Sequence, residues 1–375
     1  MTGEPTGIAM DDAQRAAWLR LSRSDGVGPA TFRDLINHFG TAAAALDALP
    51  DLAARSGRRR ITIPDTGTIS REIDALHRFG GRLVCSGEPD YPDALLAYDA
   101  APMVLNVLGD GAALRRSAIG IVGSREASLA SIKLTRLFAS AFAEAGYTVV
   151  SGLARGIDTA AHEGSLDAGT VACMAGGIDV IYPPQNEALA RAIVERGGAL
   201  VTEMPFGWKP RAKDFPRRNR IVAGMSLGLL VSEAAQRSGS LITARLANEM
   251  GREVFAVPGS PLDPRSAGAN GLIREGATFT TEPADVLDAL RPASASAKGS
   301  ILGEARSASP DPAPVTEVDG SDRARVLGAL DRTPVGVDEL VRFTGLPASA
   351  VQLVLLELDL AGGVVRHSGN RVSTL

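Results

Sequence analysis

Residues 118–158 decide the fold of the largest part of this chain, and they read AIGIVGSREASLASIKLTRLFASAFAEAGYTVVSGLARGID. Isoleucine and valine gather in two short runs, Ala118–Val122 and Tyr147–Val150, and such β-branched runs predict buried strands. The segment between them, Ile132–Ala145, has the length and composition of a helix. A strand, a helix and a strand in this order predict parallel strands joined by a helical crossover.

The same alternation continues toward the C-terminus. Further helices are predicted at 156–168, 187–196 and 242–250, and further strands at 171–175, 200–202, 227–232 and 254–257. We therefore expect an α/β fold in which residues 82–290 form a doubly wound parallel sheet.

Residues 1–81 are predicted to form a helical module. An apolar pattern near Trp18 is interrupted by Gly26-Val27-Gly28-Pro29, and Thr31 can cap a second helix. The apolar face of that helix comprises Phe32, Leu35, Ile36 and Phe39. Two short helices joined by a Gly-x-Gly turn resemble a helix-hairpin-helix (SAM-like) element, whose turn can present N–H groups to phosphate. An ordinary corner between two helices fits the same pattern.

The C-terminal part is predicted to be a separate domain. Residues 291–321 are rich in Ala, Ser and Pro and have the composition of a flexible linker. Residues 322–375 fit three helices, at 322–330, 337–343 and 348–361, followed by a hairpin, which suggests a winged-helix domain. Its third helix carries Glu357 and Asp359 but no Lys or Arg, so we predict that it contacts protein and does not read DNA.

Composition and charge exclude several classes of protein. The chain has 39 Lys+Arg and 43 Asp+Glu, a net charge of −4, so a site for a polyanion must be a local patch. Two cysteines, Cys85 and Cys173, are too few for a disulfide framework or a cysteine-built zinc site. Without a signal peptide or an apolar run of about 18 residues, we expect a cytoplasmic protein with no membrane span.

Short, glycine-rich loops follow the predicted strands. They are Gly123-Ser124-Arg125, Ser151–Asp158, Gly176–Asp179, and Glu233 with Ser238–Thr243. Small residues allow the backbone to approach a ligand, and Arg125 and Arg155 add positive charge, so together the loops predict a phosphate-binding site. Taken singly, each loop is also the tight turn that every α/β fold needs. Neither Gly-x-Gly-x-x-Gly nor a Walker A loop occurs, so we predict no nucleotide cofactor.

The segment Lys209–Arg220 is a local basic patch. It holds six basic residues and one acidic residue, a net charge of +5. Phe206, Trp208 and Phe215 lie within or beside it. Cations that follow a phosphate backbone and rings that stack on bases are what single-stranded nucleic acid requires. The alternative is a solvated basic loop with Phe206 or Trp208 turned into the core.

Several polar residues have the types that catalysis or metal binding uses. Asp158 and His162 lie four residues apart on one predicted helical face, as in an acid/base pair or half of a metal site, but a lone histidine more often makes a structural hydrogen bond. Asp179 and Glu233 follow predicted strands, where they either serve a hydrolase, cap helices or hold arginines. We predict no catalytic and no metal-binding residue.

Seven stretches, in their order along the chain, resemble the DprA/Smf family of DNA-processing proteins, which mediate recombination in natural transformation. They are AIGIVGSREAS (118–128), VVSGLARGIDTAAH (149–162), GGIDVIYP (176–183), FPRRNRIVAG (215–224), VSEA with SGSLITA (231–234 and 238–244), VFAVPG (254–259) and GANGLIREGA (268–277).

The resemblance implies a binding protein and not an enzyme. Such proteins bind single-stranded DNA through an extended Rossmann-like domain, form homodimers through that domain, and help to load the RecA recombinase. By motif match, the expected DNA-binding residues are Ser124, Arg125, Ser151, Gly152, Arg155, Gly156, Lys213, Phe215, Arg218, Asn219 and Arg220.

Two other functions stay open at this point. A nucleotide-processing enzyme of the phosphoribohydrolase type would share the sheet and the phosphate loops, but it needs a Pro-Gly-Gly-x-Gly-Thr-x-x-Glu signature, and residues 174–179 (MAGGID) lack it. A purely structural adaptor would leave the basic patch unexplained.

Overall fold

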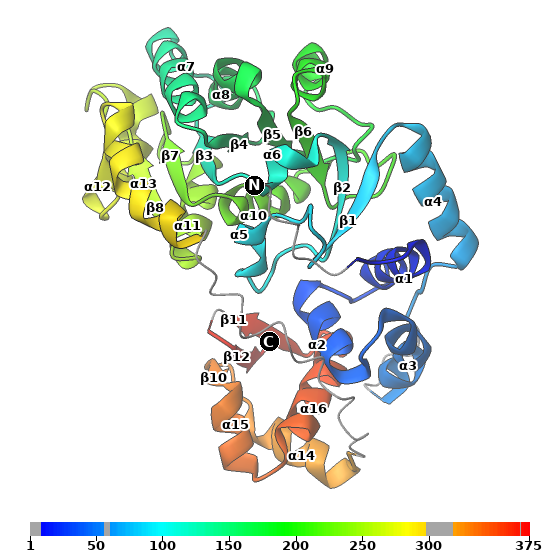
Figure 1. Cartoon of the computed structure of the whole chain (residues 1–375). Coiled ribbons are helices and arrows are strands. Elements are labelled where there is room, and N and C mark those ends of the chain that lie inside the picture. Colours follow the sequence, from blue (N-terminus) through cyan, green and yellow to red (C-terminus); the bar gives the residue numbers. More distant parts are fainter. Residues whose placement is uncertain (1–8, 56–60, 298–317, 368) are drawn as a thin grey trace. The chain divides into compact units, whose positions relative to one another are not determined.

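The computed structural model describes residues 9–55, 61–297, 318–367 and 369–375. The described residues divide into two compact units: one combines residue 9 with 71–297, and the other combines residues 10–55 and 61–70 with 318–367 and 369–375 (Figure 1). We call them the sheet unit and the terminal unit. The predicted domain boundaries at 81, 290 and 321 remain predictions, and most of the predicted linker lies outside the described residues.

The sheet unit is built on a nine-stranded sheet in the order β1-β2-β6-β5-β4-β3-β7-β8-β9. The strands are β1 (Arg82–Cys85), β2 (Val104–Gly109), β3 (Ala118–Val122), β4 (Thr148–Ser151), β5 (Thr170–Cys173), β6 (Ala199–Thr202), β7 (Gly228–Val231), β8 (Glu253–Ala256) and β9 (Thr278–Phe279). The helices are α5 (Asp93–Leu96), α6 (Gly111–Arg115), α7 (Leu129–Glu144), α8 (Ile157–Ser165), α9 (Glu187–Glu195), α10 (Asp214–Met225), α11 (Ser240–Glu249), α12 (Ala267–Arg274) and α13 (Pro283–Ala297). The predicted α/β fold is confirmed.

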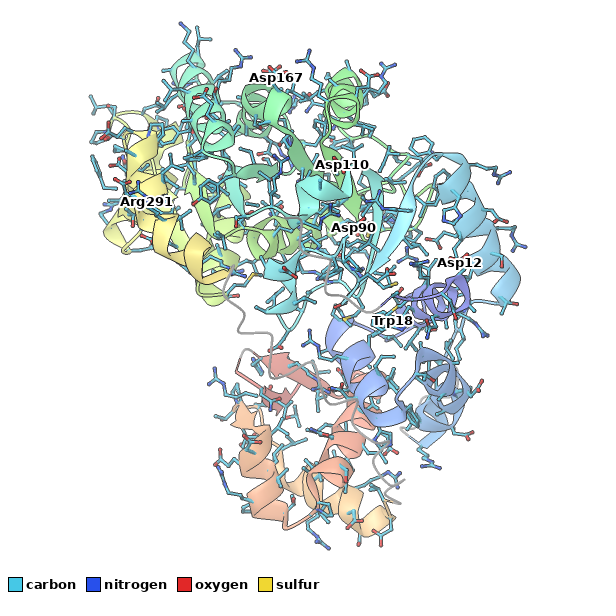
Figure 2. All side chains as sticks on the ribbon, in the orientation of Figure 1. Asp12, Trp18, Asp90, Asp110, Asp167 and Arg291 are labelled. Atoms are coloured by element: carbon cyan, nitrogen blue, oxygen red, sulfur yellow. The ribbon has the colours of Figure 1, made fainter. Side chains whose placement is uncertain are left out.

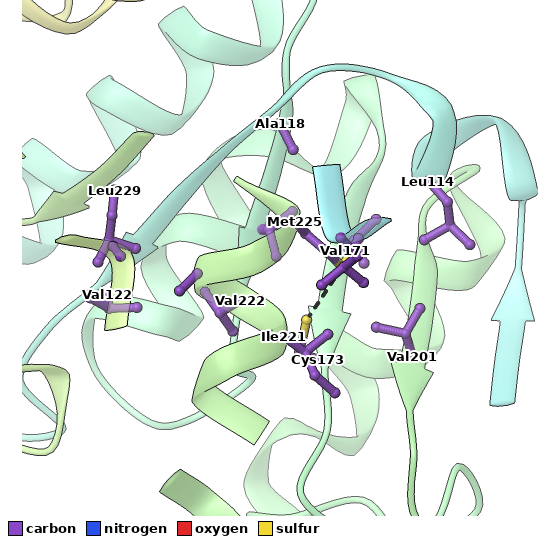
Figure 3. Close-up of a cluster of buried hydrophobic side chains, with 14 of the residues drawn as sticks. Leu114, Ala118, Val122, Val171, Cys173, Val201, Ile221, Val222, Met225 and Leu229 are labelled. Carbon is purple, nitrogen blue, oxygen red and sulfur yellow. Dashed lines mark hydrogen bonds between the residues drawn. The ribbon is translucent and has the colours of Figure 1, made fainter. Parts of the chain in front are cut away.

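Alternation along β3 explains why both faces of the sheet are covered by helices. Ile119 and Ile121 point into one apolar cluster, which includes Phe138 and Phe142 of α7. Ala118 and Val122 point into the other cluster, which includes Ile221, Val222 and Met225 of α10 (Figure 3). A strand buried on both faces is a near-continuous apolar run, which is what the sequence shows at 118–122.

Two edge strands depart from the predicted parallel sheet. All neighbouring pairs in the part of the sheet that runs β6-β5-β4-β3-β7-β8-β9 are parallel. In contrast, β2 pairs antiparallel with β6, and β1 pairs antiparallel with β2. Asp90 stabilises this edge, because its carboxylate accepts from Arg82 at 3.0 Å and also pairs with Arg115 (Figure 2). The strand pattern at 82–85 and 104–109 is too short to predict these pairings.

Hydrogen bonds from side chains set where helices start. Ser128 Oγ accepts from Ser131 N at 3.1 Å and caps α7. Asp110 Oδ1 accepts from Ala112 N at 2.8 Å and caps α6 (Figure 2). The basic segment 209–220, for which the sequence predicted no secondary structure, contributes its second half to α10.

The terminal unit combines the two ends of the described chain. Its N-terminal module comprises α1 (Asp12–Ser22), α2 (Pro29–Phe39) and α3 (Ala42–Arg55), and the unit boundary falls within α4 (Thr66–Arg78). Trp18 of α1 packs on Phe32 of α2, with ring centroids 5.0 Å apart. The winged-helix module comprises α14 (Gly320–Ala329), β10 (Val335–Gly336), α15 (Val337–Thr344), α16 (Ala348–Ala361), β11 (Val364–His367) and β12 (Arg371–Thr374).

No single helix among the described residues has both the length and the apolar composition needed to cross a membrane, although α15 and α16, which meet at 118°, pass that test together.

Candidate nucleic-acid interface

A pocket of about 540 Å³ lies at the carboxyl ends of the parallel strands β3, β4 and β7. The chain passes from β3 to β4 on one side of β3 and later adds β7 on the other side, so the loops after these strands diverge and leave a crevice. The lining residues are Val122–Glu126 after β3, Ala154, Arg155 and Asp158 after β4, Phe215, Pro216, Arg218 and Asn219 of α10, and Ala235, Arg237–Ser240, Ile242 and Thr243 after β7.

Close backbone contacts hold the loop after β3 to the segments that follow β7 and β4. Ser124 N donates to Glu233 O at 2.7 Å, and Ile157 N donates to Ser124 O at 3.1 Å. Gly156 has a φ of +74°, and a Cβ on it would lie 2.3 Å from Ser124 O, so glycine is required at the start of α8. The wall of the pocket is therefore fixed before any ligand arrives.

Arg218 places a buried guanidinium against the pocket. Its residue exposure is 5%, its Nη1 donates to Cys173 O at 2.9 Å, and its Nε has no partner among the described residues. Burial lowers the pKa of Arg218, and the nearby carboxylate of Asp158 opposes that shift. A Cβ on Gly152 would lie 1.7 Å from Arg218 Nη1, so this glycine makes room for the guanidinium. A buried cation with an unused donor attracts an anion.

Two aromatic rings and one arginine form a group in a hollow that adjoins the pocket, and we call it the aromatic cluster. The ring of Phe215 lies 5.6 Å from that of Tyr182, at an interplanar angle of 63°. Arg125 Cζ lies 5.1 Å from the centroid of the Phe215 ring. Tyr182 is exposed and Phe215 is half-buried, so flat surfaces lie beside the cations.

The other two aromatic residues of the basic segment have structural contacts. Phe206 packs on Phe79, with centroids 5.8 Å apart. Trp208 Nε1 donates to Asp214 Oδ2 at 2.9 Å, and Arg211 covers the indole ring at 4.5 Å. Both residues are partly exposed, so neither ring is turned into the core. Stacking on bases stays a prediction for Phe215.

The candidate acid/base residues are held in structural hydrogen bonds. His162 is fully buried, its Nδ1 lies 2.9 Å from Thr170 Oγ1, and burial lowers its pKa to about 3, with Arg218 as a second cause. Asp158 accepts N–H groups of Gly152 and Ala154, each at 3.2 Å, and burial raises its pKa against the opposing effect of Arg218.

The two carboxylates after strands also have local partners. Glu233 accepts from Ser131 Oγ at 2.9 Å and from Ser128 N at 3.2 Å, so it stabilises the start of α7. Asp179 accepts from Gly207 N at 2.7 Å and holds the loop that precedes the basic segment. Among the described residues, no group of three or more His, Cys, Asp or Glu side chains is placed to hold a metal ion.

Comparison with known families assigns all three parts of the chain. Residues 82–291 match the family described as DNA recombination-mediator protein A, residues 12–75 match the DprA-like N-terminal HHH domain, and residues 308–370 match the DprA winged helix domain. The chain belongs to the DprA/Smf family.

Named relatives cover most of the chain. Protein Smf of Escherichia coli is 37% identical over 370 residues, which are 95% of this chain and 94% of the relative. The X-ray structure of DprA from Streptococcus pneumoniae superposes with a TM-score of 0.59 at 31% identity, over 72% of this chain and 95% of that one. A Helicobacter pylori DprA structure, described as showing a single-stranded DNA binding mode, gives 0.52 at 26% identity, over 57% and 96%.

Within this DprA/Smf fold, most of the predicted binding residues come together. Ser124, Arg125, Arg155, Phe215, Arg218 and Asn219 line the pocket, and Gly152 lines an adjoining hollow together with several of them. They come from three separate segments of sequence, and the sheet topology unites them.

The remaining predicted residues do not line the pocket. Ser151 is fully buried, and its Oγ donates to Ile121 O at 2.6 Å. Arg220 is 8% exposed and bonds to Glu203 and Ala100 O, so its guanidinium holds α10 in place. Lys213 is exposed just before α10, and Gly156 shapes the turn. For Ser151 and Arg220 the structure therefore favours a supporting role, because both side chains are occupied by protein atoms.

The structure adds two residues that the sequence analysis did not select. Tyr182 joins the aromatic cluster, and Arg237 lies in the wall after β7, next to the predicted Ser238–Ser240. Tyr182 lies in the GGIDVIYP stretch, and Ser238–Ser240 belong to a loop that the sequence already marks as following a strand. No signal marked Arg237 or Tyr182 as binding residues, because only the three-dimensional sheet brings their loops to β3.

Proposed function

We propose that this chain binds single-stranded DNA in the pocket at the ends of β3, β4 and β7, and that it acts as a recombination mediator. The observation that carries the proposal is the aromatic cluster of Arg125, Phe215 and Tyr182 beside the buried Arg218. Guanidinium groups bind backbone phosphates, and the rings are available for bases.

Single strands fit this site better than duplex DNA. A duplex keeps its bases in the stack, so it offers no base face to Phe215 or Tyr182. The Helicobacter pylori relative, whose structure is described by its single-stranded DNA binding, supports the same choice.

A binding role fits the pocket better than catalysis does. Its lining residues include no histidine or cysteine, and Ser238 Oγ and Ser240 Oγ lie 2.7 Å apart, bonded to each other. Asp158 is occupied by two backbone N–H groups. The pocket residues therefore include no serine–histidine or cysteine–histidine pair, and the remaining carboxylate, Glu126, belongs to an exposed residue.

The DprA/Smf family supports a wider proposal. We infer that the protein protects exposed or incoming single strands, acts as a homodimer in the cytoplasm, and helps to load the RecA recombinase. The family description as a recombination mediator and the similarity to the pneumococcal DprA structure support it.

Fluorescence anisotropy with a labelled oligonucleotide, single-stranded and duplex, across a salt series tests the site. We expect the single strand to bind more tightly, with affinity that falls as salt rises. Arg125→Gln and Arg155→Gln should each weaken binding and lower the salt slope by about 0.7 for each phosphate that is no longer neutralised. Arg191→Gln, an exposed change on α9 outside the pocket, is the matched control.

An equal weakening with Arg191→Gln, or preference for duplex, would overturn the assignment. Incubation with nucleoside monophosphates then tests the enzymatic alternative, because catalytic release of ribose phosphate would identify a phosphoribohydrolase. RecA loading has its own readout: strand exchange on single strands coated with a competing binding protein should accelerate with the wild type but not with Arg125→Gln.

A further inference from the structure

The third helix of the winged-helix module, α16, is almost entirely occupied by contacts inside the terminal unit. In DNA-reading helix-turn-helix domains, the equivalent helix enters the major groove and presents cations and polar groups to bases and phosphates. Here α16 is buried along most of its length, and it carries two carboxylates, Glu357 and Asp359, but no Lys or Arg. The contacts of these two carboxylates show what α16 does instead.

Glu357 is used within the winged-helix module. It is 2% exposed, and both of its oxygens accept from Arg323 of α14, at 2.6 Å from Nε and 2.8 Å from Nη2. This bidentate pair joins α14 to α16. Glu357 is therefore unavailable to any partner outside the module.

Asp359 is used to hold the N-terminal module. Its Oδ2 accepts from Thr31 Oγ1 of α2 at 2.7 Å and lies 3.5 Å from Arg366 Nε of β11. The other end of the Arg366 guanidinium donates to Asp34 Oδ2 of α2 at 2.5 Å. One guanidinium thus lies between a carboxylate from each module, and we call Thr31, Asp34, Asp359 and Arg366 the latch.

Apolar packing accompanies the latch. Helices α2 and α3 both pack against α16, and α16 buries Val351, Leu353, Leu355 and their apolar neighbours. The charged side chains of the latch are themselves largely covered, with 29% exposure for Asp34, 18% for Asp359 and 23% for Arg366. Removing one partner of a buried ion pair leaves the other charge uncompensated, so loss of Arg366 should weaken the contact with α2.

We propose that the α16–β11 face of the winged-helix module is a protein-docking surface, and that its occupant is the N-terminal helical module of the same chain. A duplex that approached this face would meet the carboxylates of Asp34 and Asp359, and it would have to displace α2. The winged helix therefore acts as a clamp on the N-terminal module and does not read DNA with α16.

Hydrogen exchange of the full-length chain, read by peptide mass spectrometry, tests the docking. In Arg366→Gln the two carboxylates no longer share a cation, so amides of α2 and α16 should exchange about tenfold faster, while the sheet unit is unchanged. Arg342→Gln, an exposed change on α15, is the matched control and should leave both helices protected. Unchanged exchange in α2 with Arg366→Gln would overturn the proposal.

A charge reversal separates docking from unfolding of the module. Asp34→Arg combined with Arg366→Asp rebuilds the latch with opposite polarity, because the guanidinium introduced on α2 would face the two carboxylates of the winged-helix module. The double variant should recover protection of α2 and α16 relative to either single variant. Failure to recover, when α14 stays protected, would overturn the assignment.

Two further readouts identify the occupant. Protection of α2 should not depend on protein concentration, because the partner is in the same chain; a rise with concentration would assign the face to a second copy and overturn the proposal. Duplex affinity should be equal in Arg366→Gln and Arg342→Gln. A selective weakening of duplex binding in Arg366→Gln would show that the face reads DNA.

Discussion

The loops around the pocket and helix α16 both belong to motifs associated with nucleic acids, but their charged groups differ in what they contact. In the pocket, Arg125, Arg155 and Arg237 line an open hollow, and Arg218 keeps an unused donor beside it. On α16, Glu357 and Asp359 are both bonded to groups of the same chain. The shape of a DNA-binding motif therefore does not predict its ligand unless its charged groups are free.

The largest expected effect lies in the terminal unit. Arg323→Met leaves Glu357 buried without its cation, so the free energy of unfolding of this unit should fall by about 3–5 kcal/mol. Tryptophan fluorescence measures each unit separately, because the chain has two tryptophans, Trp18 in the terminal unit and Trp208 in the sheet unit. In a Trp208→Phe background, urea unfolding should shift to lower denaturant, whereas affinity for single strands should not change. An unshifted transition would show that the pair contributes nothing.

The next effect lies in the pocket. Phe215→Ala removes the ring that contacts both Arg125 and Tyr182 in the aromatic cluster, so affinity for single-stranded DNA should fall by about 1–3 kcal/mol. Phe343→Ala is the matched control, because Phe343 is 77% exposed on α15 in the other unit. Anisotropy measures both variants. A similar weakening in the two would mean that Phe215 makes no specific contact with bases.

Two buried groups, one in each unit, should make contributions of opposite sign to the pH dependence of stability. His162 has a folded pKa of about 3 against an ordinary 6.5, so between these values only the unfolded state takes up the proton, and stability falls as pH falls. From pH 7 to pH 5 the sheet unit should lose about 2 kcal/mol through this group. In a Trp18→Phe background, His162→Asn, which retains a donor for Thr170, should remove that part of the pH dependence. A slope equal to that of wild type would contradict it.

In the terminal unit the corresponding group is Asp34. Burial raises its pKa against the effect of Arg366, with Asp359 adding to the rise and Arg33 opposing it. Because the pKa of Asp34 is higher in the folded state than in the unfolded state, protonation of this carboxyl stabilises the fold. The stabilisation is complete below pH 3.8 and is lost as the pH rises through the pKa of the folded state. In Asp34→Asn, the free energy of unfolding of the terminal unit, reported by Trp18, should therefore depend less on pH in the acidic range. Steeper acid dependence in that variant would contradict the sign.

The smallest effect concerns a single cation in each unit. Arg237→Gln should weaken single-strand binding a few-fold and lower the salt slope by about 0.7, since Arg237 lines the pocket. Arg342→Gln, on α15, should change neither quantity. The salt series measures both variants, and equal slopes in the two would remove Arg237 from the site.

The parallel part of the sheet could be predicted from the sequence, because each of its strands and helices has a recognisable local pattern. β3 and α7 are each a single uninterrupted pattern, and Gly123, Gly152 and Gly156 mark where the backbone turns tightly. The antiparallel strands β1 and β2 could not be predicted in the same way. Each is short, and pairing of β2 with β6 joins residues almost a hundred positions apart.

By itself the sequence determined the α/β class, the three modules, the glycine-rich loops and the basic segment, because propensity, periodicity and charge are local properties. Only the tertiary structure decided which side chains are free. It placed Arg237 in the pocket and Tyr182 in the adjoining hollow, directed Arg220 to Glu203, and placed Asp359 against Thr31, 328 residues away along the chain. The physical reason is that the interactions of a charged group in a folded protein depend on its neighbours in space, and long-range packing sets those neighbours.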